Sequence, residues 1–158
     1  MAAPPPIFSE QELGFLHELV RQKVEFLIVG LAAAALQGVP AVTQDIDLWF
    51  RDLADPGLKK ALDRVGGIYV PPTGFTPPMF AGKSVALFDI VLTMHGLDDF
   101  ERESADALEV RLGRTRVKVL PLDRIVASKR AANREKDRLI LPVLEDAAAV
   151  LRGRKRRH

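Results

Sequence analysis

The stretch FLIVGLAAAALQGVPAVTQDIDLWF, residues 26–50, contains most of what decides the fold. It begins with an apolar run that ends at Gly30 and continues with strong helix formers that end at Gly38. It closes with DIDLWF, in which apolar residues occupy every second position. Such alternation is typical of a strand, and an alanine-rich segment closed by glycine is typical of a helix. The order strand, helix, strand indicates an α/β domain.

Two carboxylates, Asp45 and Asp47, lie in the second of these strands. Residues two apart in a strand share a face and are about 6.6 Å apart along it. Unpaired charge is costly in a dry interior, so the pair needs a partner, an ion or water. A metal site is one interpretation; the wet face of an edge strand, or the start of a loop, is the other.

A third acid, Asp89, lies inside the apolar run ALFDIVLT. If its strand pairs beside the one that carries Asp45 and Asp47, the carboxylates converge. They could then enclose two divalent ions about 3.5 to 4 Å apart, the spacing of two-metal phosphoryl chemistry. Magnesium prefers oxygen ligands, so this interpretation predicts a site for two Mg²⁺ ions.

The other segments complete an α/β (α+β) plan, a small mixed β-sheet flanked by helices and followed by C-terminal helices. We expect helices over about 9–23 and 55–67, and helical segments over 121–153 with a break near Asn133. Strands are expected at 68–70 and across 84–94, with a hairpin over 107–120. Pro142 is expected to kink or divide the last helix, and the Pro-rich segment 71–78 to be a surface loop.

Length and composition fit one soluble domain over residues 1–158, with 1–8 and 153–158 expected to be flexible. The chain is 47% apolar and 28% charged, and no apolar run is long enough to cross a membrane. It has no cysteine, and its start, MAAPPPIF, lacks the features of a signal peptide. We therefore expect a cytoplasmic protein.

Positive charge gathers in the last third of the chain, although the formal net charge is only +2. The basic segments are SKRAANREKDR, residues 128–138, and RGRKRRH, residues 152–158. Such clusters favour an anionic partner, either nucleotide phosphates or a nucleic acid. A solvated helix face and a solvated tail explain the same charges, and both interpretations stay open here.

Taken together, three segments resemble the DNA polymerase beta-like nucleotidyltransferase superfamily, particularly its minimal bacterial members and the abortive-infection type IV toxin relatives. They are residues 26–50, FDIVL at 88–92, and VLPLDRIVASKRAANREKDR at 119–138. The resemblance implies a nucleotidyltransferase-like fold and transfer of a nucleotide from an NTP to a hydroxyl of a protein, RNA or small molecule. It also implies that Asp45 and Asp47 hold both metals and that Asp89 completes the metal site.

The same resemblance places a second set of residues at the nucleotide. Gly30 would let backbone N–H groups approach the phosphates, and a basic stretch would contact the triphosphate or the acceptor. Three positions depart from the family pattern near the implied site: Leu31, where a second glycine or a serine is usual, Gln37 in place of histidine, and Ala41 in place of arginine. The nucleotide-binding residues implied are Gly30, Leu31, Thr43, Lys129, Arg134 and Lys136.

Two alternatives to an active enzyme follow from these observations. Because of the departures at Leu31 and Ala41, the chain could be a catalytically weak or inactive binding module, such as the toxin or antitoxin component of a toxin–antitoxin pair. Because of the basic C-terminal region, it could instead be a nucleic-acid-binding protein in which the acids are structural.

Overall fold

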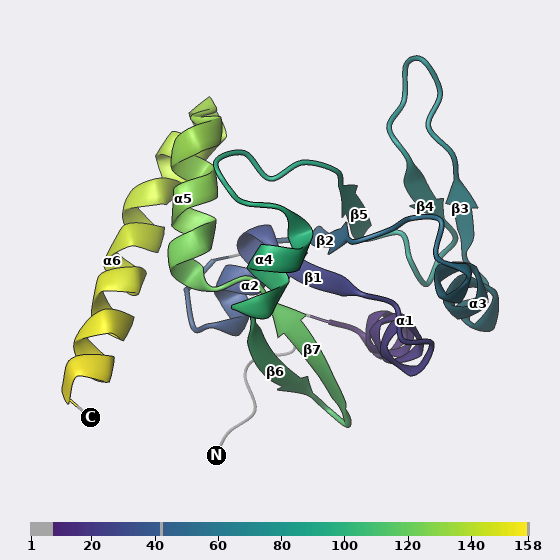
Figure 1. Ribbon diagram of the computed structural model, residues 1–158, viewed down its shortest axis with the longest axis horizontal. Coiled ribbons are helices and arrows are strands. Elements are labelled where there is room, and N and C mark those ends of the chain that lie inside the picture. Colours follow the sequence, from purple (N-terminus) through teal and green to yellow (C-terminus); the bar gives the residue numbers. More distant parts are fainter. Residues whose placement is uncertain (1–7, 42, 158) are drawn as a thin grey trace.

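Five strands form one mixed sheet in the computed structural model, which describes residues 8–41 and 43–157. The strand order is β5-β2-β1-β7-β6 (Figure 1). Pairs β2/β5 and β1/β7 are parallel, whereas β1/β2 and β6/β7 are antiparallel, which confirms the predicted mixed sheet. The strands are β1 (Phe26–Val29), β2 (Ile46–Phe50), β5 (Phe88–Val91), β6 (Leu108–Leu112) and β7 (Thr115–Val119).

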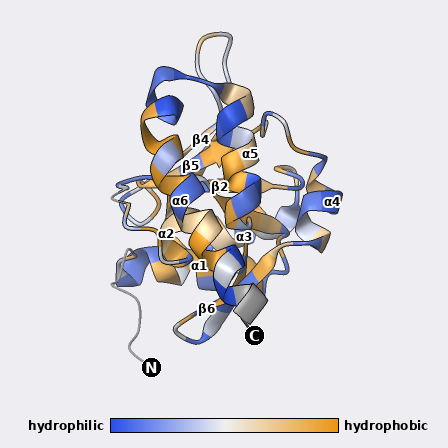
Figure 2. Ribbon diagram, turned by 90° about the vertical axis from the view of Figure 1, so that its left-hand side faces the viewer, coloured by the Kyte–Doolittle hydropathy of each residue, from blue (hydrophilic) through white to orange (hydrophobic). Residues whose placement is uncertain are grey.

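Six helices accompany the sheet in the described part of the chain. Ser9 and Glu12 form the capping box that begins the first helix, and Asn133, in the left-handed conformation, separates the last two. The final helix contains Pro142 and is not divided by it. Hydrophilic (blue) and hydrophobic (orange) residues alternate along this helix in Figure 2. The helices are α1 (Glu10–Arg21), α2 (Gly30–Leu36), α3 (Pro56–Val65), α4 (Phe100–Ala105), α5 (Leu122–Ala132) and α6 (Glu135–Arg157).

The alternation predicted for DIDLWF decides which helices cover which face of the sheet. On one face, the ring of Phe88 in β5 packs edge-on against Phe15 of α1, with ring centroids 5.0 Å apart. On the other face, Trp49 of β2 packs edge-on against Phe100 of α4, at 5.4 Å. Because Asp47 is two residues from Trp49 in the same strand, it shares the α4 face.

Three features differ from the sequence expectations. The strand predicted over 84–94 is limited to β5, because turn hydrogen bonds from Val85 N to Gly82 O and from Phe88 N to Val85 O interrupt its first part. Strand β4 (Met79–Ala81) was not predicted, and it pairs with β3 (Ile68–Val70) in a separate two-stranded sheet. Helix α4 was also missed, although Asp99 caps it by accepting a hydrogen bond from Arg102 N.

The Pro-rich segment 71–78 joins β3 to β4 as an exposed loop, as predicted. The expected flexible ends stay a prediction, since residues 1–7 and 158 lie outside the described part and α6 runs through Arg157. None of the helices described combines the length and the apolar character that crossing a bilayer requires.

Candidate active site

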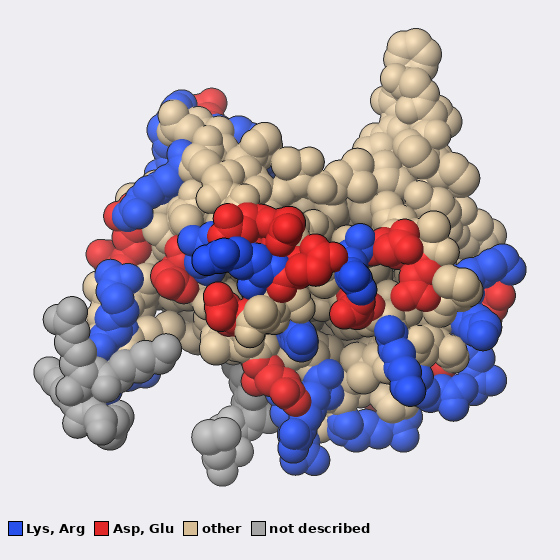
Figure 3. All heavy atoms as spheres, in the orientation of Figure 1, with Lys and Arg blue, Asp and Glu red and all other residues tan. Residues whose placement is uncertain are grey.

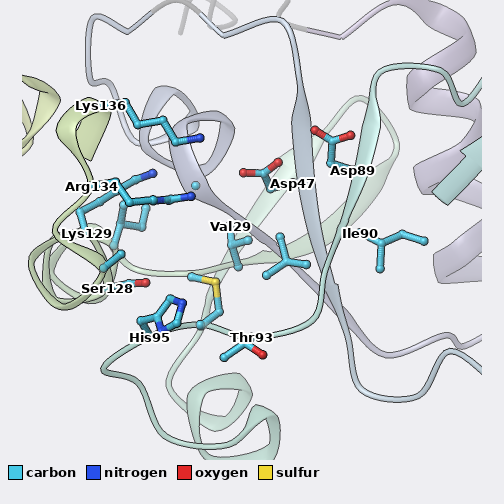
Figure 4. A pocket seen from close by; sticks show the side chains of 15 residues that line it. Val29, Asp47, Asp89, Ile90, Thr93, His95, Ser128, Lys129, Arg134 and Lys136 are labelled. Atoms are coloured by element: carbon cyan, nitrogen blue, oxygen red, sulfur yellow. The ribbon is translucent and has the colours of Figure 1, made fainter. Parts of the chain in front are cut away.

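A pocket of about 320 Å³ lies between strands β2 and β5 on one side and helices α5 and α6 on the other (Figure 4). It brings together residues that are far apart in the sequence. Six of the nine predicted site residues line it: Gly30, Asp47, Asp89, Lys129, Arg134 and Lys136. The remaining three, Leu31, Thr43 and Asp45, are not part of its lining.

Asp47 and Asp89 are direct register partners across the parallel strands β2 and β5. Figure 4 shows their carboxylates side by side at the pocket. Neither carboxylate has a hydrogen bond or an ion pair with another side chain among the described residues, so both are left to solvent or to a ligand. They therefore present carboxylates without a directly bound cation to the pocket.

The surroundings of both carboxyls disfavour the charged form. For Asp47, partial burial raises the pKa most, the negative charge of Asp89 raises it further, and the ammonium of Lys129 opposes this rise. For Asp89, partial burial of the carboxyl and then the charge of Asp45 raise the pKa. A cation bound between the two carboxylates would relieve this repulsion.

Gly30 is the residue that lets Asp47 occupy this position. Its φ of +67° lies in the left-handed region, which favours glycine. A Cβ atom at this position would lie 2.5 Å from Oδ2 of Asp47, which is closer than atoms can pack. The backbone conformation therefore favours glycine at the end of the β1 run, and a larger residue would displace the Asp47 carboxylate. Its predicted contact with phosphates stays a prediction.

The opposite wall of the pocket is basic, and a buried acid holds two of its three cations. Asp137, only 1% exposed, accepts hydrogen bonds from Nε of Arg134 at 2.7 Å and from its backbone N at 3.1 Å. Nζ of Lys129 lies 3.3 Å from Oδ1 of Asp137. Burial alone would raise the pKa of Asp137, but these partners overcome it and lower the pKa to about 2. Lys136, the third cation, has no ion pair among the described residues.

Three predicted residues lie elsewhere. Asp45 is exposed and precedes β2, although its charge still raises the pKa of Asp47 and Asp89. Oγ1 of Thr43 donates a hydrogen bond to the backbone oxygen of Asp45 at 2.8 Å. Leu31 is partly buried and packs against the hydrophobic core.

Gln37 and Ala41, which the resemblance implies to be near the site, are not part of the pocket lining. The Gln37 amide instead ties α2 to the start of α5. It donates hydrogen bonds to the backbone oxygens of Ala33 at 3.0 Å and Leu120 at 2.8 Å, and accepts one from Leu122 N at 2.9 Å.

Sequence reasoning did not assign the other lining residues to the site, and Thr93, Met94, His95 and Ser128 are among them. The first three closely follow the strand of Asp89, and Ser128 directly precedes Lys129; this adjacency is the signal that could have found them. Gly96 holds the loop after β5 close to α5, since a Cβ there would lie 2.5 Å from the Cβ of Ala131.

No protein-family model and no curated protein matches this chain in sequence. Its structure is similar to the crystal structure of ANT(2'')-Ia in complex with adenylyl-2''-tobramycin, with a TM-score of 0.55. The match has 16% sequence identity and covers 90% of this chain and 95% of that chain. That neighbour is an aminoglycoside nucleotidyltransferase. The chain has a nucleotidyltransferase-like fold.

The donor set at the pocket suits a hard divalent cation that shares its ligands with a substrate. No group of three or more acids or histidines within the described residues is arranged to hold a metal alone. Asp47 and Asp89 offer two carboxylates, and Mg²⁺ usually combines one or two carboxylates with waters and substrate phosphates. The two residues thus fit a Mg²⁺ ion that arrives with a nucleotide.

Proposed function

We propose that this chain catalyses Mg²⁺-dependent transfer of a nucleoside monophosphate from an NTP to an acceptor hydroxyl. The observation that carries the proposal is the opposition of acids and cations across one pocket, with Asp47 and Asp89 facing Lys129, Arg134 and Lys136. A nucleoside triphosphate with its metal matches both walls, because the metal suits the carboxylates and the phosphates suit the cations.

In this reaction the acceptor oxygen attacks the α-phosphorus of the NTP in line with the leaving group. A bond forms between that oxygen and the α-phosphorus, the O–H bond of the acceptor breaks and its proton passes to solvent, the α–β phosphoanhydride bond breaks, and pyrophosphate leaves with the electron pair. The bound metal would neutralise charge on the attacking and leaving oxygens. The cations of α5 and α6 bind and orient the triphosphate and stabilise charge on the departing pyrophosphate.

The proposal assigns the residues different roles. Asp47 and Asp89 would ligate the metal, and Lys136 would reach the triphosphate directly because Asp137 does not hold it. Lys129 and Arg134 would contact phosphates while remaining anchored to Asp137. A second Mg²⁺ ion would require Asp45 as a further ligand. The similarity to a structure that contains an adenylyl product makes ATP the first donor to test.

The test is calorimetric titration of the protein with ATP in the presence and absence of MgCl₂, followed by transfer of label from α-³²P-ATP. We expect binding to require Mg²⁺ and to be lost in Asp47→Asn and Asp89→Asn. Turnover should fall by at least about 10²-fold, since loss of one preorganised group costs about 10²- to 10³-fold. Asp106→Asn, at an exposed acid away from the pocket, is the matched control. Binding that persists without Mg²⁺ and in both pocket variants would contradict the proposal.

An inactive nucleotide-binding module is the second candidate function. It is favoured by the capture of Lys129 and Arg134 by Asp137 and by Leu31 at the turn after β1. Mg²⁺-dependent ATP binding without release of pyrophosphate, with GTP, CTP and UTP equally unreactive, would support it. A toxin or antitoxin partner and a nucleic acid bound by the basic C-terminal region stay predictions; steep loss of RNA binding with added salt would support the latter.

A further inference from the structure

We propose that residues 68–82, here called the arm, form a surface through which two copies of this chain associate. The arm consists of β3, the Pro-rich loop and β4, and it projects from the rest of the molecule (Figure 1). No Asp, Glu, Lys or Arg occurs in it, although 28% of the whole chain is charged. Figure 3 shows the projection as a charge-free protrusion.

The two faces of the arm differ in what they contact. Tyr69 and Phe80, which are register partners, attach it to the core: the ring of Phe80 packs edge-on against Phe15 at 5.5 Å and against Phe50 at 5.9 Å. Neighbouring strand positions point to the opposite face. That outer face is apolar, and its Ile68 and Met79 side chains are 63% and 50% exposed.

The tip of the arm is braced by hydrogen bonds within the loop itself. The hydroxyls of Thr73 and Thr76 are 2.6 Å apart, and Thr73 N donates to Thr76 O at 2.9 Å. Thr76 N and Phe75 N both donate to Oγ1 of Thr73, at 3.1 and 3.3 Å. Phe75 is 100% exposed at this tip. A preformed apolar anchor loses little conformational freedom on binding.

The absence of charge in the arm favours a second copy as its partner. In a twofold dimer the same patch meets itself, so a charged patch would bring like charges together, whereas this one brings none. A nucleic acid would require cations that the arm lacks. The arm has 15 residues, fewer than the roughly 20 to 30 per partner of a stable interface. We therefore expect a weak dimer, with a dissociation constant on the order of 10 μM.

The test is sedimentation equilibrium of the full chain over a range of concentrations. The mass of the wild type should rise from 17.4 kDa towards twice that value above about 10 μM. The double variant Phe75→Ser/Met79→Ser should stay monomeric, with unchanged thermal unfolding because both side chains are exposed. Leu139→Ser, which removes a 77% exposed leucine from α6, is the matched control and should dimerise like the wild type.

Several results would overturn the proposal. The first is a wild type that stays monomeric at about 500 μM, fifty times the expected dissociation constant. The second is a double variant that still dimerises. The third is loss of the dimer in Leu139→Ser as well. A monomer that binds uncharged phosphatidylcholine vesicles only when Phe75 is present would assign the arm to a membrane surface instead.

Discussion

Asp47 lines the pocket, Asp137 is buried against two cations of the opposite wall, and their surroundings shift their pKa values in opposite directions. Asp137 is buried beneath donors from Arg134 and Lys129, and its pKa is lowered to about 2. Asp47 has no such partner among the described residues, and partial burial followed by the charge of Asp89 raises its pKa. One acid is neutralised by the fold itself, whereas the other is neutralised only when a cation or a proton binds.

This contrast separates a structural acid from a candidate ligand-binding acid without reference to any relative. A buried carboxylate that is fully paired stabilises the fold. Removal of its charge leaves the paired cations without a partner and lowers the free energy of unfolding. A carboxylate placed beside another carboxylate costs stability, which makes it a candidate ligand-binding group. Three substitution experiments can break or sharpen the comparison.

The largest effect is expected from Asp137→Asn. The substitution leaves Lys129 and Arg134 facing a neutral amide, and we expect the free energy of unfolding to fall by about 3 kcal/mol. Urea denaturation measures the change. Asp63→Asn is the matched control, since Asp63 pairs with Lys59 at 3.4 Å on the exposed surface and should contribute less than about 1 kcal/mol. If both variants lose the same stability, Asp137 is no more than a surface partner.

A smaller effect is expected from Gly30→Ala, which presses a methyl group against Asp47. The left-handed backbone alone costs a non-glycine residue about 1 to 2 kcal/mol. Gly113→Ala isolates this cost, because Gly113 has a similar φ of +62° and open space around its Cβ position. We expect Gly30→Ala to be the more destabilising by about 1 kcal/mol, the cost of a displaced side chain.

The additional destabilisation of Gly30→Ala over Gly113→Ala should disappear in an Asp47→Ala background, because the carboxylate that contacts the new methyl group is then absent. Thermal or urea unfolding of the four combinations of substitutions at 30 and 47 gives the coupling directly. A coupling near zero would show that Asp47 does not depend on Gly30 for its position.

The sequence predicted the acids of the pocket better than it predicted their partners. Alternation in DIDLWF placed Asp47 on one face of a strand, and the apolar run around Asp89 placed that acid in a second strand, which the structure pairs with β2. Both inferences depend on local periodicity, which a sequence displays. Asp45 was grouped with them because it is two residues from Asp47, but β2 begins after it, and a strand boundary is decided by tertiary pairing.

The role of Asp137 could not be predicted in the same way. Its partners come from both sides of the left-handed Asn133, and the angle between α5 and α6 decides whether Lys129 reaches it. Gln37 shows the same limit, since its amide bonds to backbone groups 83 and 85 residues away in the sequence. Long-range hydrogen bonds of this kind leave no periodic signal.

The smallest effect is expected in the pH dependence of stability, and it carries opposite signs for the two acids. A raised folded-state pKa means that Asp47 favours folding in its protonated form, so its contribution is greatest at low pH and is lost as pH rises through the folded pKa. Asp47→Asn should therefore gain stability relative to the wild type as pH rises from about 4 to 7.

Asp137 stabilises the fold fully above its ordinary pKa of 3.8, and this stabilisation is lost as pH falls towards about 2. The deficit of Asp137→Asn should accordingly shrink in that lower range. Parallel pH profiles for the two variants, measured by thermal unfolding, would show that the two acids do not differ in charge compensation.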